Sequence, residues 1–171
     1  MILATLAMLA VLAPAHACPI SAATLLPELT GTWEVLRISG LDRPRPDSGL
    51  ARSTFVAELQ NCLIREQLRE VAGNPPYEAL ILWGVNGADG SIQRVFTHSQ
   101  HGRFGMYEGR RAGSTVILRQ LPISAQPSTD VVENQLLMSD ADHFSLVSRI
   151  SSDSGATWRT LSRLDYRRTS H

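Results

Sequence analysis

The sequence contains no lysine, and its charges cancel. All 16 basic residues are arginine and they balance 16 acidic residues, so the formal net charge is zero. A protein that binds nucleic acid normally carries an excess of basic residues on one face, whereas these arginines are scattered along the chain. We therefore expect no nucleic-acid partner.

Long apolar runs are also missing, apart from one at the N-terminus. The run Ile2–Ala13 is shorter than the ~20 apolar residues that a membrane-spanning helix needs, so we expect no transmembrane segment. Pro14 and the small-x-small sequence Ala15–Ala17 follow it, which disfavours an N-terminal core helix and is typical of a signal-peptidase site. We predict a signal peptide at residues 1–17 and an exported protein, periplasmic or secreted.

Only two cysteines are present, and the sequence leaves their state open. Cys18 would be the first residue after cleavage, where a lipid could anchor the chain to a membrane. Ala17 suits lipidation, but Ala15 stands where a leucine-like residue is normally required. Alternatively Cys18 and Cys62 pair as a disulfide in an oxidising compartment, or both remain free thiols. Cys62 has no identifiable base beside it, so a buried structural role is favoured over a nucleophilic one.

Short segments rich in β-branched and aromatic residues alternate with turn residues from residue 28 onward, which indicates an all-β domain. For example, Asn86–Gly90 and Arg111–Ser114 contain residues that tolerate a positive φ between two strand-like runs. Residues 18–27 form a short lead, and residues 28–168 form a single domain. We predict ten strands, at 31–39, 53–59, 62–71, 77–85, 92–99, 103–109, 115–121, 131–138, 143–150 and 157–167.

Alternation along the strands predicts which side chains share a face. Ile92, Arg94, Phe96 and His98, for example, lie on the same face of one strand. Ten consecutive strands most simply close into an antiparallel up-and-down β-barrel, because an open sheet would leave unpaired edges. A barrel of this size can enclose one small ligand. The aromatic residues that would either line such a cavity or fill the barrel are Trp33, Trp83, Phe96 and Tyr107.

Two stretches are less regular than the rest. Asp42–Ser48 contains two prolines and is predicted as an irregular loop, because proline lacks the N–H donor that a sheet needs. Phe55–Arg69 is predicted as parts of two strands. A helix over part of it is the alternative, because the charged residues of this stretch would decorate a helical face.

Several short motifs follow one another in the predicted strands. The first strand contains Gly31-Thr32-Trp33, the GxW triplet with which lipocalins and fatty-acid-binding proteins begin. The later motifs are Tyr77-Glu78, Trp83–Asn86, Arg94–Phe96, Tyr107–Gly109 and Leu164–Arg168. In this order they resemble a family of uncharacterised bacterial lipocalin-like proteins within the calycin-like barrels, and the resemblance covers about residues 28–168.

This resemblance implies an up-and-down barrel and no established activity. In related calycin barrels an arginine of the last strand packs over the first-strand tryptophan, so the resemblance implies that Arg163 or Arg168 packs over Trp33. The sequence departs from the family's pattern at His98, where an acidic residue is commoner.

The string SSDSGATW, Ser151–Trp158, matches the Asp-box of sialidase propellers at every specified position. A sialidase would need several blades of about four strands each, which a chain of this length cannot supply. We predict instead a hairpin turn before the last strand. In such a turn Asp153 accepts hydrogen bonds from backbone N–H groups, Gly155 adopts a positive φ, and Trp158 covers the hairpin.

Signatures of catalysis are missing, because the sequence contains no GxSxG, phosphate loop or HExxH. His98 and His101 would share a metal ion only if the chain turned between them, so we expect no metal site and no cofactor. We predict a non-catalytic protein that binds a small apolar or amphipathic molecule through Trp33, Trp83, Phe96, His98 and Tyr107. The alternatives are a small barrel enzyme, a haem or redox protein that uses His98 or Cys62, and a purely structural envelope protein.

Overall fold

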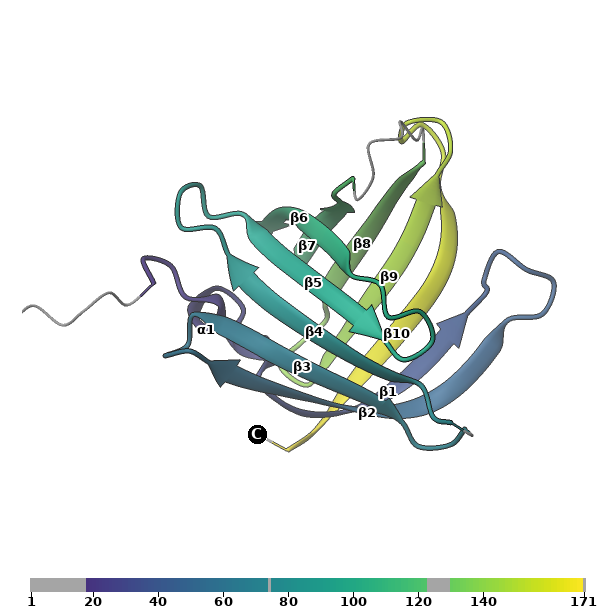
Figure 1. The fold of residues 1–171 in the computed structure, drawn as a ribbon, viewed down its shortest axis with the longest axis horizontal. Helices are drawn as coiled ribbons and strands as arrows, with labels where there is room; N and C mark the ends of the chain where they lie inside the picture. The colour runs from purple at the N-terminus through teal and green to yellow at the C-terminus, as the bar shows by residue number, and fades with distance from the viewer. Residues whose placement is uncertain (1–17, 74, 123–129, 171) are drawn as a thin grey trace, which may run out of the picture.

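The computed structural model describes residues 18–73, 75–122 and 130–170, so the predicted signal peptide lies outside the described residues. Ten antiparallel strands close into a barrel in the order β1-β10-β9-β8-β7-β6-β5-β4-β3-β2 (Figure 1). Strands that follow one another in the sequence are paired, and β10 closes the barrel on β1. The predicted antiparallel up-and-down barrel is therefore confirmed. The strands are β1 (Gly31–Ser39), β2 (Asp47–Glu58), β3 (Leu63–Glu70), β4 (Glu78–Val85), β5 (Ile92–His98), β6 (Gly105–Ala112), β7 (Thr115–Gln120), β8 (Val131–Met138), β9 (His143–Ser151) and β10 (Arg159–Ser170).

Two details of β2 and β3 differ from the sequence predictions. Strand β2 already begins at Asp47, so the predicted irregular loop Asp42–Ser48 ends earlier than expected. The helical alternative over Phe55–Arg69 is wrong, because this stretch forms the end of β2, a turn and most of β3. Burial alternates along β3 with the period of two that a strand imposes.

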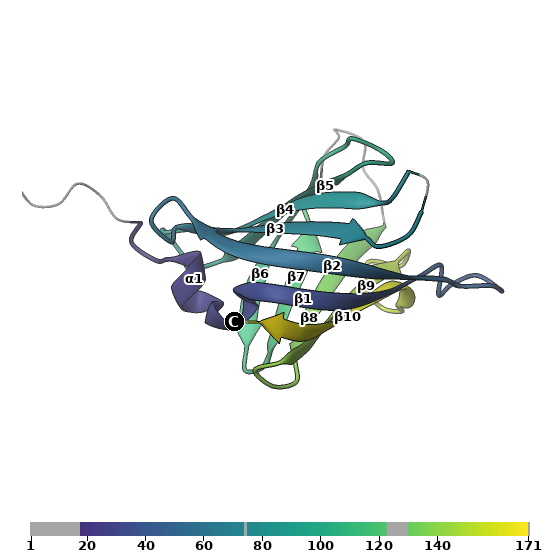
Figure 2. The ribbon, with the colours of Figure 1, turned by 90° about the horizontal axis from the view of Figure 1, so that it is seen from below.

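The N-terminal segment covers one end of the barrel. It forms the short helix α1 (Ala22–Leu25) and the 3₁₀ turn η1 (Pro27–Leu29), and Figure 2 shows α1 at the end where β1 begins and β10 ends. Leu26 and Leu29 are fully buried. Trp33 donates a hydrogen bond from Nε1 to the carbonyl of Leu29 over 2.9 Å, so the first-strand tryptophan is held directly beneath this cover.

The two candidate arginines of the last strand have different positions. Arg168 lies over the ring of Trp33, with 4.1 Å between its guanidinium carbon and the ring centroid. It also donates to the carbonyls of Glu28 and Thr30, both over 2.6 Å. Arg163 instead pairs with a carboxylate of its own strand, at an odd-numbered position that faces away from the barrel interior. Arg168 is therefore the arginine that packs over the first-strand tryptophan.

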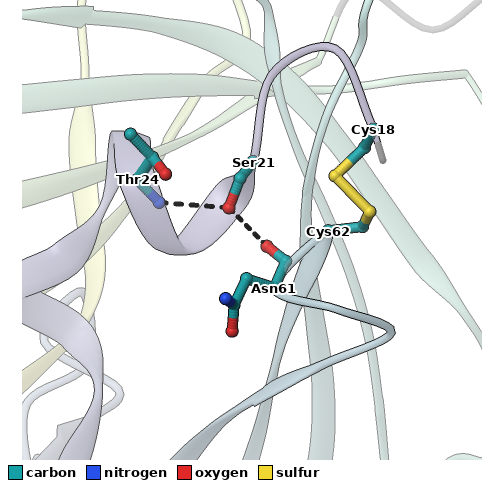
Figure 3. Close-up of a disulfide and its surroundings, with 5 residues drawn as sticks. All are labelled: Cys18, Ser21, Thr24, Asn61 and Cys62. Carbon is teal, nitrogen blue, oxygen red and sulfur yellow. Dashed lines mark hydrogen bonds between the residues drawn. A yellow bond between two sulfur atoms is a disulfide. The ribbon is translucent and has the colours of Figure 1, made fainter. Parts of the chain in front are cut away.

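A disulfide joins Cys18 to Cys62, beside the turn between β2 and β3 (Figure 3). Of the states that the sequence left open, this is the one observed. Neither cysteine has the free thiol that lipidation of Cys18 or nucleophilic chemistry by Cys62 would require. Ser21 strengthens the junction, because its hydroxyl donates to the carbonyl of Asn61 over 2.6 Å and accepts from the backbone N–H of Thr24 over 3.3 Å.

Residues 152–158 connect β9 to β10 as a hairpin turn. The two carboxylate oxygens of Asp153 accept hydrogen bonds from the backbone N–H and the hydroxyl of Thr157, at 2.8 and 2.6 Å. Gly155 has a φ of 100°, which favours glycine. Trp158 donates from Nε1 to the carbonyl of Gly155, and its ring centroid lies 4.3 Å from the guanidinium carbon of Arg149. These partners and this φ value account for Asp153, Gly155, Thr157 and Trp158 as parts of a turn.

Replacing Asp153 with alanine is expected to lower the midpoint of thermal unfolding at neutral pH. Hydrogen bonds from Ser151 and then from Thr157 hold the pKa of Asp153 well below its usual range. A depressed pKa means that the carboxylate stabilises the fold fully above the unfolded-state pKa of about 3.9, and loses this effect as the pH falls toward the folded-state pKa. The difference in midpoint between the wild-type protein and the variant should therefore shrink from pH 7 to pH 3, as followed by circular dichroism.

Asp153→Asn is the matched control, because it keeps the shape of the side chain and one acceptor oxygen but cannot ionise. Its loss of stability should be smaller than that of the alanine variant. Equal midpoints for the wild-type protein and Asp153→Ala at neutral pH would contradict a stabilising role of this carboxylate.

Candidate ligand-binding cavity

The inward-facing side chains divide the barrel interior into a packed part and an open part. Next to α1, aromatic rings fill the barrel: Trp33 and Phe144 lie 4.6 Å apart between ring centroids, and Phe144 stacks on Tyr166 at 4.1 Å. Farther from α1 lies a cavity of about 470 Å³. Its lining includes apolar walls from Leu68, Ile81, Phe96, Leu146 and Leu164, and polar groups from Glu66, Arg94, Tyr107, Asn134 and Ser148.

The predicted ligand-binding residues fall into these two parts. Phe96, His98 and Tyr107 line the cavity. Trp33 and Trp83 do not line it, because both are fully buried in the packed part, with exposed fractions of 0% and 1%. The aromatic residues therefore realise both alternatives that the sequence left open: the two tryptophans fill the barrel, and the other three residues border its cavity.

Depth within the cavity follows from the direction of β5. The turn before β5 lies at the covered end, since a Cβ atom on Gly87 would come within 2.6 Å of Pro19. The inward side chains of β5 then run from this end toward the mouth in the order Ile92, Arg94 and Phe96, with His98 last. Arg94 consequently lies at the inner end of the cavity and His98 near its mouth.

Glu66 is the most deeply buried acidic group that borders the cavity, with 1% of its surface exposed. Its Oε1 accepts hydrogen bonds from the hydroxyls of Ser53 and Tyr166, each over 3.0 Å. Its Oε2 accepts one from Nε1 of Trp83 over 3.1 Å. These bonds link strands β2, β3, β4 and β10 through a single carboxyl group.

Burial controls the protonation of this cluster. Burial raises the pKa of Glu66, and this effect outweighs the positive charge of Arg94 and the hydrogen bonds from Trp83, Tyr166 and Ser53, which lower it. The pKa of Tyr166 also lies well above its usual value, because the ring is buried and the negative charge of Glu66 lies close to its hydroxyl. The cluster therefore favours a protonated tyrosine and a carboxyl group that binds its proton more tightly than an exposed one.

Arg94 is the cation at the inner end of the cavity. Only 6% of its surface is exposed, and its Nε atom is buried without a hydrogen-bond partner among the described residues. Its guanidinium carbon lies 5.2 Å from the ring centroid of Trp83, 5.1 Å from that of Phe96 and 5.8 Å from that of Tyr107. The arginine is thus surrounded by aromatic rings that attract its charge.

The mouth of the cavity carries two histidines. The chain turns after β5, where the N–H groups of His101 and Gly102 donate to the carbonyl of His98. This turn brings the rings of His98 and His101 to 5.0 Å between centroids. Burial, together with the charge of His101, lowers the pKa of His98, and its buried Nδ1 atom has no hydrogen-bond partner among the described residues.

Arg37 also borders the mouth, but carboxylates already pair with it. Its guanidinium contacts Glu70 at 2.6 Å and Asp47 at 2.9 Å. Tyr77 lies beside this group, with its ring centroid 6.0 Å from the guanidinium carbon. Arg37 at the mouth is therefore neutralised, whereas no carboxylate among residues 18–73, 75–122 and 130–170 is hydrogen-bonded to Arg94 at the inner end.

In the described part of the chain, no three side chains of histidine, cysteine, aspartate or glutamate come together in a way that would hold a metal ion. Among the same residues, no helix has the length and apolar character needed to cross a membrane.

Alternation along β5 predicts that Arg94 faces inward, but it does not mark this residue as part of a site. The available signal was a charged residue in the apolar, inward-facing series of β5. Glu66 was harder to find, because its segment was ambiguous between helix and strand. Its hydrogen-bond partners lie up to 100 positions away in the sequence, so only the closed barrel brings them together.

Comparisons with known proteins support the fold. No protein-family model and no curated protein matches the sequence. Among solved structures, Rv2717c from M. tuberculosis is similar, with a TM-score of 0.61 and 14% identity over 86% of this chain and 97% of the other. The S-type phycobiliprotein lyase CPES from Guillardia theta has a TM-score of 0.55 and 13% identity over 88% of this chain and 93% of the other. At these identities the likeness shows a shared barrel.

Proposed function

We propose that this chain is an exported protein that binds a small amphipathic molecule inside its barrel and does not catalyse a reaction. The observation that carries the proposal is the interior cavity of about 470 Å³, which combines apolar walls with a polar inner end. Small-molecule sites typically measure about 300–1,000 Å³ and place a few polar groups among apolar walls.

Three alternatives to ligand binding are a structural barrel, a redox protein and a haem protein or enzyme. A purely structural barrel would be expected to fill its interior, as the aromatic rings next to α1 do. A redox role for Cys62 has no thiol to use in the disulfide-bonded chain. His98 lies at the mouth in ring contact with His101, and the colour test below distinguishes the haem alternative from ligand binding.

Two broader assignments belong to the same proposal. Export is supported by the N-terminal sequence pattern and by the disulfide, because disulfides persist mainly in oxidising compartments such as the periplasm and the extracellular space. Membership of the uncharacterised bacterial lipocalin-like family is supported by the order of the motifs and by the barrel itself.

The test is a search for a bound molecule, followed by a binding assay. Native mass spectrometry of protein purified from its own cells should show a bound small molecule, and a fluorescent fatty-acid probe should bind to the emptied protein. Phe96→Ala is expected to change the probe affinity several-fold, because Phe96 borders the cavity. Leu80→Ala, on the outer face of β4, is the control and should leave it unchanged.

If the purified protein carries nothing and the probe does not bind, the ligand-binding function is wrong. A coloured protein that loses its colour in His98→Ala would instead support the haem alternative.

A further inference from the structure

We propose that the ligand carries an anionic head group of the carboxylate class, and that Arg94 binds this head group at the inner end of the cavity. This inference rests on the proposed function and adds the charge and the orientation of the ligand. The apolar part of the molecule then lies along the cavity walls and points toward the mouth.

The first observation is that Arg94 is a buried cation without hydrogen-bond acceptors in the part of the chain that the structure describes. It is 94% buried, given its exposed fraction of 6%, and it borders the cavity. Its Nε atom has no partner among the described residues. The faces of three aromatic rings around the guanidinium attract its charge, but a ring face is not an oxygen acceptor for its N–H groups. Buried N–H groups normally have such acceptors, so the site is incomplete without a further molecule.

The second observation is that Glu66 does not complete the site. Its carboxyl oxygens receive their hydrogen bonds from Ser53, Trp83 and Tyr166, and none from Arg94. Burial raises the pKa of Glu66, which favours its neutral form and weakens it further as a counter-charge. An anion that enters the cavity would therefore meet a cation whose charge is only partly compensated.

The third observation concerns the shape and lining of the space around Arg94. Leu68, Ile81 and Phe96 form apolar walls between the inner end and the mouth. These walls suit an alkyl or aromatic group, whereas the planar guanidinium suits a carboxylate, which accepts two parallel hydrogen bonds from it. A doubly charged phosphate fits less well, because one arginine compensates only one charge.

The experiment compares three molecules that share a ten-carbon chain and differ in head-group charge. Isothermal titration calorimetry with the emptied wild-type protein would use decanoate, 1-decanol and decylammonium. Decanoate should bind at least about tenfold more tightly than the alcohol, because hydrogen bonds to charged groups are the stronger class. Decylammonium should bind most weakly, because it would meet a like charge.

Variants of Arg94 test whether this residue causes the preference for decanoate. Arg94→Met should bring the affinities for decanoate and 1-decanol close together, since the apolar walls remain while the cation is removed. Arg69→Met is the matched control, because it removes an arginine from the outer surface, where 71% of the side chain is exposed. It should keep the full preference for decanoate. Arg94→Lys keeps the charge without the planar fork, so an intermediate preference is expected.

Two results would overturn the inference while leaving the proposed function intact. One is equal binding of decanoate and 1-decanol by the wild-type protein. The other is an unchanged preference for decanoate in folded Arg94→Met or, if that variant does not fold, in the equally uncharged Arg94→Gln. Failure of all three molecules to bind would count against the proposed function itself.

Discussion

Replacing Glu66 with alanine is expected to lower the free energy of unfolding by about 3–5 kcal/mol, because three buried donors lose their acceptor and each costs about 1–3 kcal/mol when unsatisfied. The donors belong to Ser53, Trp83 and Tyr166, on strands far apart in the sequence. The loss would be measured by urea denaturation at neutral pH. Glu78→Gln, at an ion pair on the outer surface where 52% of the glutamate side chain is exposed, is the control and should cost little.

Glu66→Gln tests the protonation of the same group. The raised folded-state pKa of Glu66 means that its stabilising contribution is complete below the unfolded-state pKa of about 4.3, and is lost as the pH rises through the folded-state value. Glutamine cannot ionise, so the stability of the wild-type protein relative to this variant should be greatest near pH 4 and decrease toward pH 8. Parallel stability profiles of the two proteins over this range would contradict the raised pKa.

Reducing the disulfide is expected to lower the free energy of unfolding by about 4 kcal/mol, on the loop-entropy relation for a closed loop of this size. The bond joins residues that are 44 positions apart and fastens the N-terminal cover to the turn between β2 and β3. Without it, the unfolded chain regains conformational freedom and α1 is held only by non-covalent contacts. Denaturation curves with and without dithiothreitol would measure the loss.

The double variant Cys18→Ala/Cys62→Ala is the control for this experiment. It should be as unstable as the reduced wild-type protein and should not respond to dithiothreitol. Ligand binding by the folded variant should persist, because the disulfide lies at the covered end of the barrel and the mouth of the cavity at the other. A wild-type protein whose stability does not change on reduction would show that the disulfide is dispensable.

Much of the fold was predictable from local sequence. Turn residues such as those of Asn86–Gly90 separated the strands, and alternation placed Ile92, Arg94, Phe96 and His98 on one face, as the buried and cavity-lining positions of β5 confirm. Prediction was weaker at the start of β2 and over Phe55–Arg69. There the residues are compatible with more than one local structure, and pairing with neighbouring strands decides between them.

The candidate site was predictable only in part. Phe96, His98 and Tyr107 were expected to face the interior and do line the cavity. The same reasoning grouped Trp33 and Trp83 with them, because alternation indicates which face a side chain occupies and not its depth along the barrel axis. The difference between filling the barrel and bordering the cavity depends on how the strands are tilted and staggered on closure.

Local sequence was enough to predict most of the strands, their alternating faces, the hairpin at Asp153 and the up-and-down order, because each depends mainly on residues close together in the chain. Only the folded barrel shows that Cys18 pairs with Cys62, that Arg168 rather than Arg163 covers Trp33, and that Glu66 accepts hydrogen bonds from three donors. It also buries Arg94 at the end of a cavity, with no acceptor for its Nε atom among the described residues. These features depend on which distant residues meet when β10 closes on β1, and local patterns do not specify those encounters.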